Sequence, residues 1–505
     1  MSEHHLSDQE IGRRDKLQKI RSLGIDPYPA ALYPITHSSS AAKEAYSKDK
    51  ETKLDVCLAG RITSVNDKGK VLFIKILDGA GLIQLYVKRD DICPTEDKTF
   101  FDEIVKHLDL GDFIGVKGYM FTTKTGEDSI HSTEISLLSK SLKPLPVVKT
   151  DADGNVHDAI SDPEMRYRQR YVDLIVTPGV KEVFIKRSKI INSMRQFFND
   201  KGYLEVETPI LQPIPGGAAA RPFITHHNTL DMSLYLRIAN ELYLKKLIVG
   251  GFDAVYEFAK DFRNEGMDRT HNPEFTMMEI YVAYKDYNWM MDMTEDMLEK
   301  IAIDATGSSD VQLGDTIINF KKPFKRISMY DAIKEHTGID VSQMDENELR
   351  EVCKSLHIEV DASMGKGKLI DEIFGGKCEA KYIQPTFITD YPIEMSPLCK
   401  KHRDNEALVE RFELMINGKE IANAYSELND PLDQRARFEE QTKLMERGDD
   451  EAMFIDYDFL RALEYGMPPT SGMGIGIDRL VMLLTNQSSI QDVLFFPQMR
   501  PEKNS

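Results

Sequence analysis

Residues 255–281 read VYEFAKDFRNEGMDRTHNPEFTMMEIY, and this stretch decides the fold of the larger part of the chain. Apolar and polar residues alternate over 255–263 and again over 275–281, which predicts two β-strands. The polar residues 264–273 between them predict a hairpin with a long, charged connection. Because side chains alternate along a strand, one face of the second strand carries Phe275, Met277, Glu279 and Tyr281.

The residue types in this hairpin suit an anionic and a cationic ligand at once. Arg263 ends the first strand, where its guanidinium can bind a phosphate through two parallel hydrogen bonds. An aromatic ring and a carboxylate on one face of the second strand could hold a nucleobase and an ammonium group. The same pattern also fits an ordinary hairpin with a solvated loop, so other motifs must decide between the two.

A second hairpin is predicted over 412–423, where Asn417-Gly418 is a strong signal for a two-residue turn. In that register Glu413 and Glu420 lie diagonally on one face. Two carboxylates with substrate phosphates are a common binding site for Mg²⁺, although two exposed surface glutamates would give the same pattern. Asn423 and Glu427 fall on the opposite face unless a bulge or bend intervenes.

The third segment, Gly472 to Arg479, combines a glycine-rich strand with the start of a helix. Glycines let a ligand approach a strand backbone closely, and a helix N-terminus favours an anion. A tight strand–helix turn with a salt-bridging arginine is the plainer interpretation. The chain has no phosphate-loop motif, and these glycines lack dinucleotide-binding spacing.

Outward from these segments, the chain divides by pattern. Five short β-rich runs within 54–138 predict a small closed barrel of the OB-fold type, which binds single-stranded nucleic acid on one face. Long helices mixed with strands follow and predict an α+β domain. The expected divisions are an N-terminal helix and linker at 1–53, the barrel at 54–145, a linker at 146–178, and the α+β domain at 179–505 with a helical insertion around 326–375.

Composition restricts the class of protein. The 505 residues carry 64 basic and 83 acidic side chains, a net charge of −19. Residues 1–150 hold 22 of each, so the later residues hold 42 basic and 61 acidic side chains and the whole excess. The five cysteines form no C-x-x-C pair, no apolar run is long enough to span a membrane, and the first residues are polar. Together these features predict a cytoplasmic protein without a membrane partner.

Together the three segments resemble the three signature motifs of class II aminoacyl-tRNA synthetases. The first motif matches the predicted helix 179–201 and the strand ending at Pro209, the second 262–275, and the third 474–479. Within that class the chain resembles the lysyl-tRNA synthetases over nearly its whole length. The resemblance implies an N-terminal anticodon-binding barrel and a catalytic domain with an antiparallel sheet flanked by helices. The segments that carry this resemblance are PGGAAARPF (215–223), THHN (225–228), NELYLK (240–245), FTMME (275–279) and YSELND (425–430).

The resemblance implies ATP-dependent ligation of L-lysine to tRNA(Lys) through a lysyl-adenylate, by a homodimer formed through the first motif. It implies a catalytic role in phosphate binding for Arg263 and Arg479. The other implied nucleotide contacts are Glu265, His271, Asn272 and Phe275, and the implied Mg²⁺ ligands are Glu413 and Glu420.

For lysine, the resemblance implies contacts from Gly217, Glu241, Glu279, Tyr281, Asn423 and Glu427. In the barrel it implies that Phe73 stacks on the central anticodon uridine and that Gln84 hydrogen-bonds to it, with Arg61 and Glu134 as neighbours. For Phe73 alone, a place in the core is the commoner role of a strand phenylalanine.

The sequence departs from the family pattern at four positions. Asn240 stands where a proline is usual, Ala422 and Ala424 stand for glycines and would narrow the space beside the substrate, and Ser471 replaces a glycine. Two other functions stay open at this stage. One is a lysyl ligase that acts on a protein acceptor, against which the barrel argues. The other is a non-catalytic scaffold, against which the intact arginines and glutamates argue.

Overall fold

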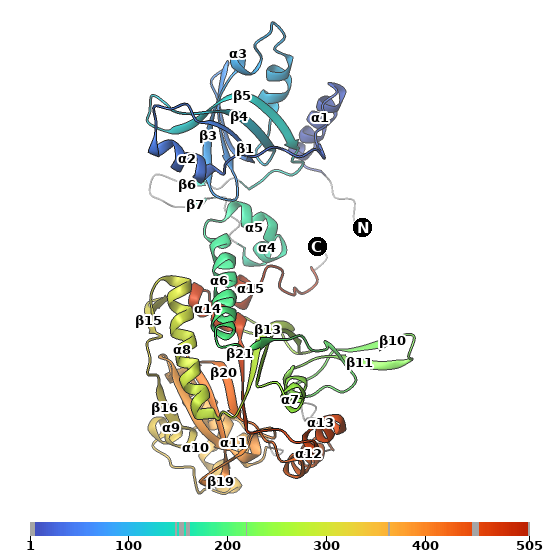
Figure 1. Cartoon of the computed structure of the whole chain (residues 1–505), viewed down its shortest axis with the longest axis vertical. Helices are drawn as coiled ribbons and strands as arrows, with labels where there is room; N and C mark the ends of the chain where they lie inside the picture. The colour runs from blue at the N-terminus through green and yellow to red at the C-terminus, as the bar shows by residue number, and fades with distance from the viewer. Residues whose placement is uncertain are drawn as a thin grey trace. The chain divides into compact units, whose positions relative to one another are not determined.

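The computed structural model describes residues 6–146, 149–150, 156–157, 162–218, 220–361, 364–446 and 454–502 (Figure 1). The chain forms two compact units, Met1–Ser161 and Asp162–Ser505. Parts of the linker predicted at 146–178 lie outside the described residues, as does Ala219 in the segment 215–223. The α+β class predicted from the sequence is confirmed by an all-β barrel in the first unit and a helix-flanked sheet in the second.

The first unit contains the closed five-stranded barrel that the strand spacing predicts, in the order β1-β2-β3-β5-β4. Alternate residues of each strand point inward, and the apolar ones among them form one buried cluster. The outward residues of the same strands therefore provide a continuous external face. The strands are β1 (Asp55–Asp67), β2 (Val71–Leu77), β3 (Leu82–Lys88), β4 (Phe113–Thr122) and β5 (Asp128–Ser139).

Helix α1 (Asp8–Ser22) begins at a capping box, in which Ser7 and Glu10 exchange hydrogen bonds. The segment expected to be a linker also contains a helix, α2 (Ser39–Lys48), which buries Ala42 and Tyr46 against the barrel core. The nearby prolines and serines obscured this amphipathic stretch. The unit also contains α3 (Arg89–Ile92), η1 (Phe100–Ile104), η2 (Val105–His107), β6 (Lys149–Thr150) and β7 (Val156–His157).

The second unit is built on a nine-stranded sheet in the order β16-β17-β19-β20-β21-β13-β12-β8, with β18 paired to β19. It is antiparallel as predicted, except that β8 and β16 join its two edges in parallel. The strands are β8 (Leu204–Glu205), β12 (Ala254–Phe262), β13 (Glu274–Ala283), β16 (Lys325–Ser328), β17 (Thr386–Pro392), β18 (Lys401–His402), β19 (Asn405–Ile416), β20 (Lys419–Ser426) and β21 (Thr470–Gly476).

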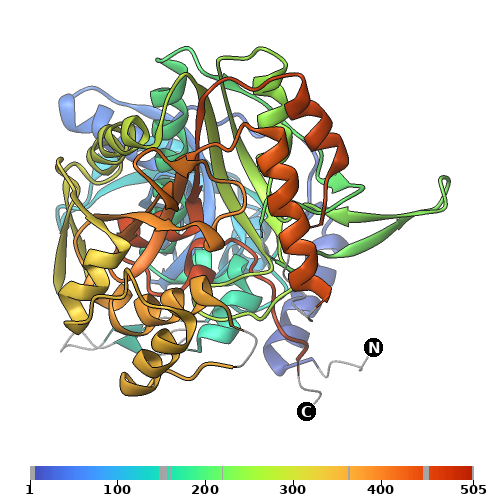
Figure 2. The same cartoon turned by 90° about the horizontal axis from the view of Figure 1, so that it is seen from below.

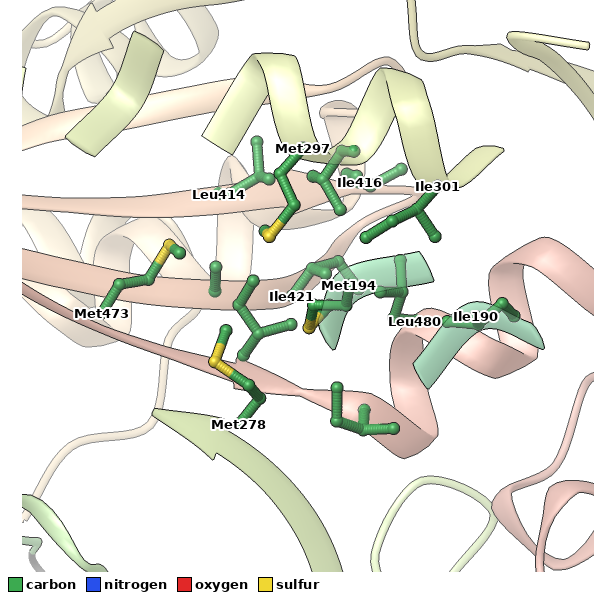
Figure 3. Packing of buried hydrophobic residues seen from close by; sticks show 14 of the residues in the cluster. Ile190, Met194, Met278, Met297, Ile301, Leu414, Ile416, Ile421, Met473 and Leu480 are labelled. Atoms are coloured by element: carbon green, nitrogen blue, oxygen red, sulfur yellow. The ribbon is translucent and has the colours of Figure 1, made fainter. Parts of the chain in front are cut away.

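One face of this sheet is packed with apolar side chains under three helices, α6 (Val180–Asn199), α8 (Tyr287–Thr306) and α14 (Ile477–Thr485). Figure 3 shows Met194 of α6 and Met297 of α8 meeting Met473 and Met278 of the sheet in one cluster. Because side chains alternate, the other face of the same strands is free to carry polar residues.

Two short helices, α4 (Pro163–Arg168) and α5 (Arg170–Val176), form where the sequence predicts a linker. Arg170 is fully buried, pairs with Asp173 at 2.5 Å and donates a hydrogen bond of 2.7 Å to the backbone carbonyl of Gln491. These residues are therefore an ordered part of the second unit.

The insertion predicted around 326–375 contains α9 (Met329–Thr337), α10 (Glu346–Ser355) and α11 (Lys366–Lys377), which share a separate apolar cluster with β17 and β19. In Figure 2 the hairpin of β10 and β11 projects from the body of this unit. The remaining elements are α7 (Glu241–Val249), α12 (Pro431–Glu446), α13 (Tyr457–Glu464), α15 (Ile490–Val493), η3 (Glu379–Lys381), η4 (Ile393–Met395), β9 (Leu211–Gln212), β10 (Ile224–His227), β11 (Met232–Leu236), β14 (Asp310–Leu313) and β15 (Thr316–Asn319).

Among the described residues, no helix is both long enough and apolar enough to cross a lipid bilayer.

Candidate active site

A cavity of about 530 Å³ opens on the face of the sheet opposite α6 and α8. Its walls come from the central strands β13, β19, β20 and β21 and from the loop between β12 and β13. Strand alternation explains its lining, because the residues of β13 that do not enter the apolar core face the cavity. These residues include Phe275, Met277, Glu279 and Tyr281.

The loop between β12 and β13 supplies one end of the cavity, which we call the nucleotide end. Its cavity-lining residues are Arg263, Glu265, His271, Asn272 and Phe275. The guanidinium of Arg263 lies 5.1 Å from the ring centroid of Phe275, and the backbone NH of Arg263 donates to the carbonyl of Pro273 at 2.9 Å. The hairpin thus holds a cation and an aromatic ring side by side.

Hydrogen bonds organise this loop. His271 lies 2.9 Å from a carboxylate oxygen of Asp268, and the amide of Asn272 donates to the carbonyl of Glu274 at 2.5 Å. Burial alone would raise the pKa of Asp268, but hydrogen bonds from His271 and Thr270 outweigh it and hold that pKa below its usual value. Asp268 therefore stays ionised and fixes the ring of His271.

Strand β21 and helix α14 bring Arg479 to the nucleotide end. Its guanidinium donates to the backbone carbonyl of Glu420 at 2.9 Å, and another of its nitrogens lies 3.4 Å from His271. Only glycine fits at position 472 on β21. A Cβ atom there would lie 2.1 Å from a carboxylate oxygen of Glu427 and 2.4 Å from the ring of Tyr281.

The hairpin of β19 and β20 supplies two carboxylates. Asn417 and Gly418 form the predicted tight turn with positive φ angles of 53° and 65°. Met415 pairs with Glu420 as predicted, but the register then shifts, so that Glu413 pairs with Asn423. This bulge brings Glu413, Glu420 and Asn423 together in the cavity lining, which the unbulged register does not do.

Charge at this carboxylate pair is only partly balanced. Arg411 donates to Glu413 at 2.6 Å and to the amide oxygen of Asn423 at 3.1 Å. Burial raises the pKa of Glu413 to about 7, and the neighbouring charge of Glu420 adds to the rise while Arg411 opposes it. Two acidic oxygen donors that repel one another suit a hard divalent cation, so the donor set fits Mg²⁺ with substrate oxygens completing its coordination. Among the described residues no cluster of three or more such ligands occurs.

The opposite end of the cavity, the amino-acid end, is built from buried carboxylates. Glu279 is 6% exposed and accepts a hydrogen bond of 2.9 Å from the hydroxyl of Tyr281. Burial, together with the charges of Asp261 and Glu241, raises the pKa of Glu279 well above its usual value. Gly217 has φ of 87° and packs its backbone on Glu241, since a Cβ there would lie 3.3 Å from the Cβ of Glu241.

Glu241 and Glu427 share a partner that the sequence did not suggest. Lys245, one turn after Glu241 on α7, is fully buried and forms ion pairs with both carboxylates. The hydroxyl of Tyr425 also donates to Glu241 at 2.6 Å. Glu427 has no exposed side-chain surface and is not among the residues that line the cavity; it lies beneath Gly472.

The structure therefore gathers thirteen of the fourteen residues expected to bind ATP, Mg²⁺ or lysine around one cavity, and it places Glu427 directly behind the wall. Sequence reasoning missed Arg411, Lys245 and Tyr425. Two of these had a usable signal, because Lys245 is four residues from Glu241 on a helix and Arg411 is two residues from Glu413 on a strand.

One expectation about the departures from the family pattern was wrong. Ala422 and Ala424 belong to the apolar cluster under α8, with 1% and 0% exposure, and do not line the cavity. They face the core because the residues that alternate with them face the cavity. Ser471 is also buried and donates to the carbonyl of Tyr425 at 3.1 Å, while the amide of Asn240 donates to Glu257 at 3.0 Å.

On the barrel, Phe73 and Gln84 occupy neighbouring outward positions on β2 and β3. Phe73 pairs with Tyr86 and Gln84 with Lys75 in the ladder. The rings of Phe73 and Tyr86 meet edge to face at 5.5 Å, and the buried amide of Gln84 donates to Ser129 at 3.0 Å. The partly exposed ring and the buried amide thus lie on neighbouring strands, on the same side of the barrel wall.

The other two residues expected in this region lie elsewhere in the ladders. Arg61 pairs with Leu77 and stacks on Phe113 at 4.2 Å, and its guanidinium donates to the carbonyl of Gly111. Glu134 pairs with Lys117, to which it is bound at 2.9 Å. Neither residue occupies a ladder position next to Phe73.

The cavity lies on an antiparallel sheet, and each of two motifs contributes an arginine to it: the hairpin of β12 and β13 contributes Arg263, and the turn from β21 to α14 contributes Arg479. This arrangement is that of a class II tRNA synthetase. The family profile described as tRNA synthetases class II (D, K and N) matches residues 162–500. A profile described as OB-fold nucleic acid binding domain matches residues 56–138.

Three relatives are lysine–tRNA ligases that align with 99% of this chain. Those of Porphyromonas gingivalis and Christiangramia forsetii are each 65% identical, over 86% and 87% of their own lengths. That of Azobacteroides pseudotrichonymphae is 63% identical over 99% of its length. The chain belongs to the lysine–tRNA ligase family.

Proposed function

We propose that this chain ligates L-lysine to tRNA(Lys) at the expense of ATP. The main support for this proposal is the cavity, which has arginines and an aromatic ring at one end and buried carboxylates at the other. Lysine carries two ammonium groups and ATP carries a triphosphate, so the two ends match the two substrates in charge. Family membership gives the same reaction.

The reaction proceeds in two transfers. The carboxylate of lysine attacks the α-phosphorus of ATP in line, the bond to the β-phosphate oxygen breaks, and pyrophosphate leaves. A ribose hydroxyl at the 3′ end of the tRNA then attacks the carbonyl carbon of lysyl-adenylate, and AMP leaves. The chain contributes by positioning the reactants and stabilising charge, so no side-chain nucleophile is required.

At the nucleotide end, Arg263 and Arg479 would bind the phosphates, and the adenine would lie on Phe275. Glu265, His271 and Asn272 would complete the nucleotide contacts. The proximity of Arg263 to the ring of Phe275 supports this assignment, because one short segment then binds both a phosphate and a base.

Glu413 and Glu420 would hold Mg²⁺, with Arg411 fixing the first of them. When bound, the cation would neutralise charge on the phosphate oxygens. The raised pKa of Glu413 supports the assignment, since the two neighbouring carboxylates lack a full counter-charge of their own.

At the amino-acid end, the α-ammonium of lysine would lie near Glu241 and Gly217. Its ε-ammonium would meet Glu279 and Tyr281, with Asn423 nearby and Glu427 contributing from behind Gly472. A buried carboxylate without a partner is costly, so an amino acid that lacks the second amine would be rejected strongly.

The outer face of the barrel would bind the anticodon of tRNA(Lys), with Phe73 stacking on a base and Gln84 hydrogen-bonding to it. Arg61 and Glu134 would act further along the face, because the ladder separates them from Phe73. The active protein would be a cytoplasmic homodimer in which α6 and the following strand pair with a second copy. The domain divisions would be those predicted from the sequence, except that α4 and α5 would belong to the catalytic domain.

ATP–pyrophosphate exchange with each amino acid in turn tests the substrate. We expect exchange with lysine and none with aspartate or asparagine. Exchange with either of those amino acids and none with lysine would overturn the proposal. Transfer of lysine to a protein without transfer to tRNA would support the alternative ligase instead.

Replacing Phe73 by alanine tests the barrel's role. Loss of one base-stacking ring should raise the KM for tRNA by roughly tenfold, while lysine-dependent pyrophosphate exchange stays unchanged. Val65→Ala, which removes another partly exposed apolar side chain of the barrel, is the control. Equal effects of the two substitutions on aminoacylation would remove Phe73 from the RNA interface.

A further inference from the structure

Directly behind the amino-acid end of the cavity lies an ammonium group of the protein itself. Lys245 is fully buried, and its Nζ lies 2.5 Å from Oε1 of Glu241 and forms a second ion pair with Glu427. The ring centroids of Tyr425 and Phe459 lie 5.5 and 5.8 Å from the same nitrogen. The chain thus surrounds its own lysine with the groups that usually recognise an alkylammonium: carboxylates and aromatic rings.

The carboxylates at the amino-acid end outnumber the basic side chains that pair with them. Three carboxylates lie here, those of Glu241, Glu279 and Glu427, and within the described residues Lys245 is the one basic side chain that pairs with any of them. When all three are ionised, one ammonium against three carboxylates leaves two negative charges. The two ammonium groups of lysine would balance these charges, while its own carboxylate lies toward the nucleotide end.

The arrangement also divides the three carboxylates by task. Glu241 and Glu427 are held by Lys245, whereas the hydroxyl of Tyr281 is the one hydrogen-bonding side chain that Glu279 has among the residues that the structure describes. Glu279 is therefore the carboxylate whose charge is left for the substrate. Glu241 lines the cavity in an orientation that Lys245 and Tyr425 fix.

A purely stabilising role explains this arrangement less well. A buried ion pair contributes little to stability compared with apolar packing, and α7 already buries Leu244 before Lys245 and Ile248 after it. The next residue offers a comparison on the same helix. Lys246 pairs with Asp458 at 2.8 Å near the surface and faces none of the three carboxylates.

We propose that Lys245 is a positioning residue that determines specificity for a diammonium amino acid, by neutralising one of the three carboxylates and fixing Glu241 and Glu427. This inference rests on the proposed function. It predicts that the chain without this ammonium still binds ATP but loses its match to lysine, because two carboxylates then lack a cation.

Lys245→Met removes the charge and keeps most of the volume, and Lys246→Met is the matched control. Lysine-dependent pyrophosphate exchange by the unmodified chain is measured first, since its absence would refute the proposed function and not this inference. We expect K245M to raise the KM for lysine by about 100-fold, with the KM for ATP changed less than twofold and K246M close to the parent. Equal changes in the two KM values, or equal effects of K245M and K246M, would overturn the proposal.

Chemical rescue separates charge from packing. Lys245→Ala opens a space of the size of propylammonium, and we expect added n-propylammonium to lower the KM for lysine of K245A at least tenfold. The neutral 1-propanol should not do so, and propylammonium should leave K246M unchanged. Rescue by both compounds would show that packing alone matters, and rescue by neither would contradict the charge role. If K245M and K245A both fail to fold while K246M folds, Lys245 is a stability residue and the proposal fails.

Discussion

The two ends of the cavity use the same residue type in opposite ways. At the nucleotide end the side chain of Glu420 is 41% exposed and lies 3.6 Å from the partly exposed Arg479, so water and an arginine share its charge. At the amino-acid end the side chain of Glu427 has no exposed surface and is held by a fully buried lysine. The charge of Glu420 is thus shared with water, whereas the charge of Glu427 is balanced only inside the protein.

The difference has a chemical purpose. The proposed metal and triphosphate would arrive with their own shells of water, and a partly open end would let those shells be exchanged in steps. An alkylammonium is distinguished from an alkyl group only where water cannot substitute for it. The three substitutions or conditions below test this contrast, starting with the largest expected effect.

Replacing Arg263 by alanine should abolish function at the nucleotide end alone. Loss of a preorganised donor to the reacting phosphate should lower the rate of pyrophosphate exchange about 1,000-fold, with the KM for lysine within a few-fold of the parent. Arg269→Ala, in the same loop but outside the cavity lining, is the control. A loss no greater than that of R269A would contradict a phosphate-binding role.

Replacing Glu279 by glutamine should affect the other end. The amide keeps the shape but removes the charge that the substrate balances, so the kcat/KM for lysine should fall roughly 100-fold while the KM for ATP stays close to the parent. Glu274→Gln, an exposed position on the same strand, is the control. If E279Q changed the two substrates equally, the separation of the ends would be wrong.

The two ends should also differ in their response to pH. Burial and the charges of Asp261 and Glu241 raise the pKa of Glu279 well above its usual value, so binding of lysine to the ionised carboxylate is coupled to the loss of a proton. The KM for lysine should therefore fall as pH rises from 6 to 8, by at most about tenfold per pH unit. E279Q should flatten this dependence, and an equally steep dependence in E279Q would assign it to another group.

Local pattern was enough to predict much of the fold and most of the site. The five barrel strands, the alternation along β13 and the turn at Asn417-Gly418 all depend on neighbouring residues, and each is present. The sequence could not decide whether a bulge pairs Glu413 with Asn423, because an irregularity of one residue depends on how the two strands pack and not on their composition.

Features that depend on packing between distant segments escaped prediction. Lys245 could not be placed against Glu427 without the sheet that brings α7 and β20 together. Ala422 and Ala424 were assigned to the wrong side of their strand for the same reason, since the register after the bulge decides which face they take. The helices α4 and α5 are fixed by Arg170, whose partners include residues more than 300 positions away.

The position of β21 in the sheet has a consequence for synthesis of the chain. This strand lies between β20 and β13, although it is the last of the sheet's strands to leave the ribosome. The two walls of the cavity are therefore separate until Thr470–Gly476 inserts between them. A nascent chain that stops before this segment cannot join the two halves of the catalytic sheet, so the cavity cannot form until this segment has been made.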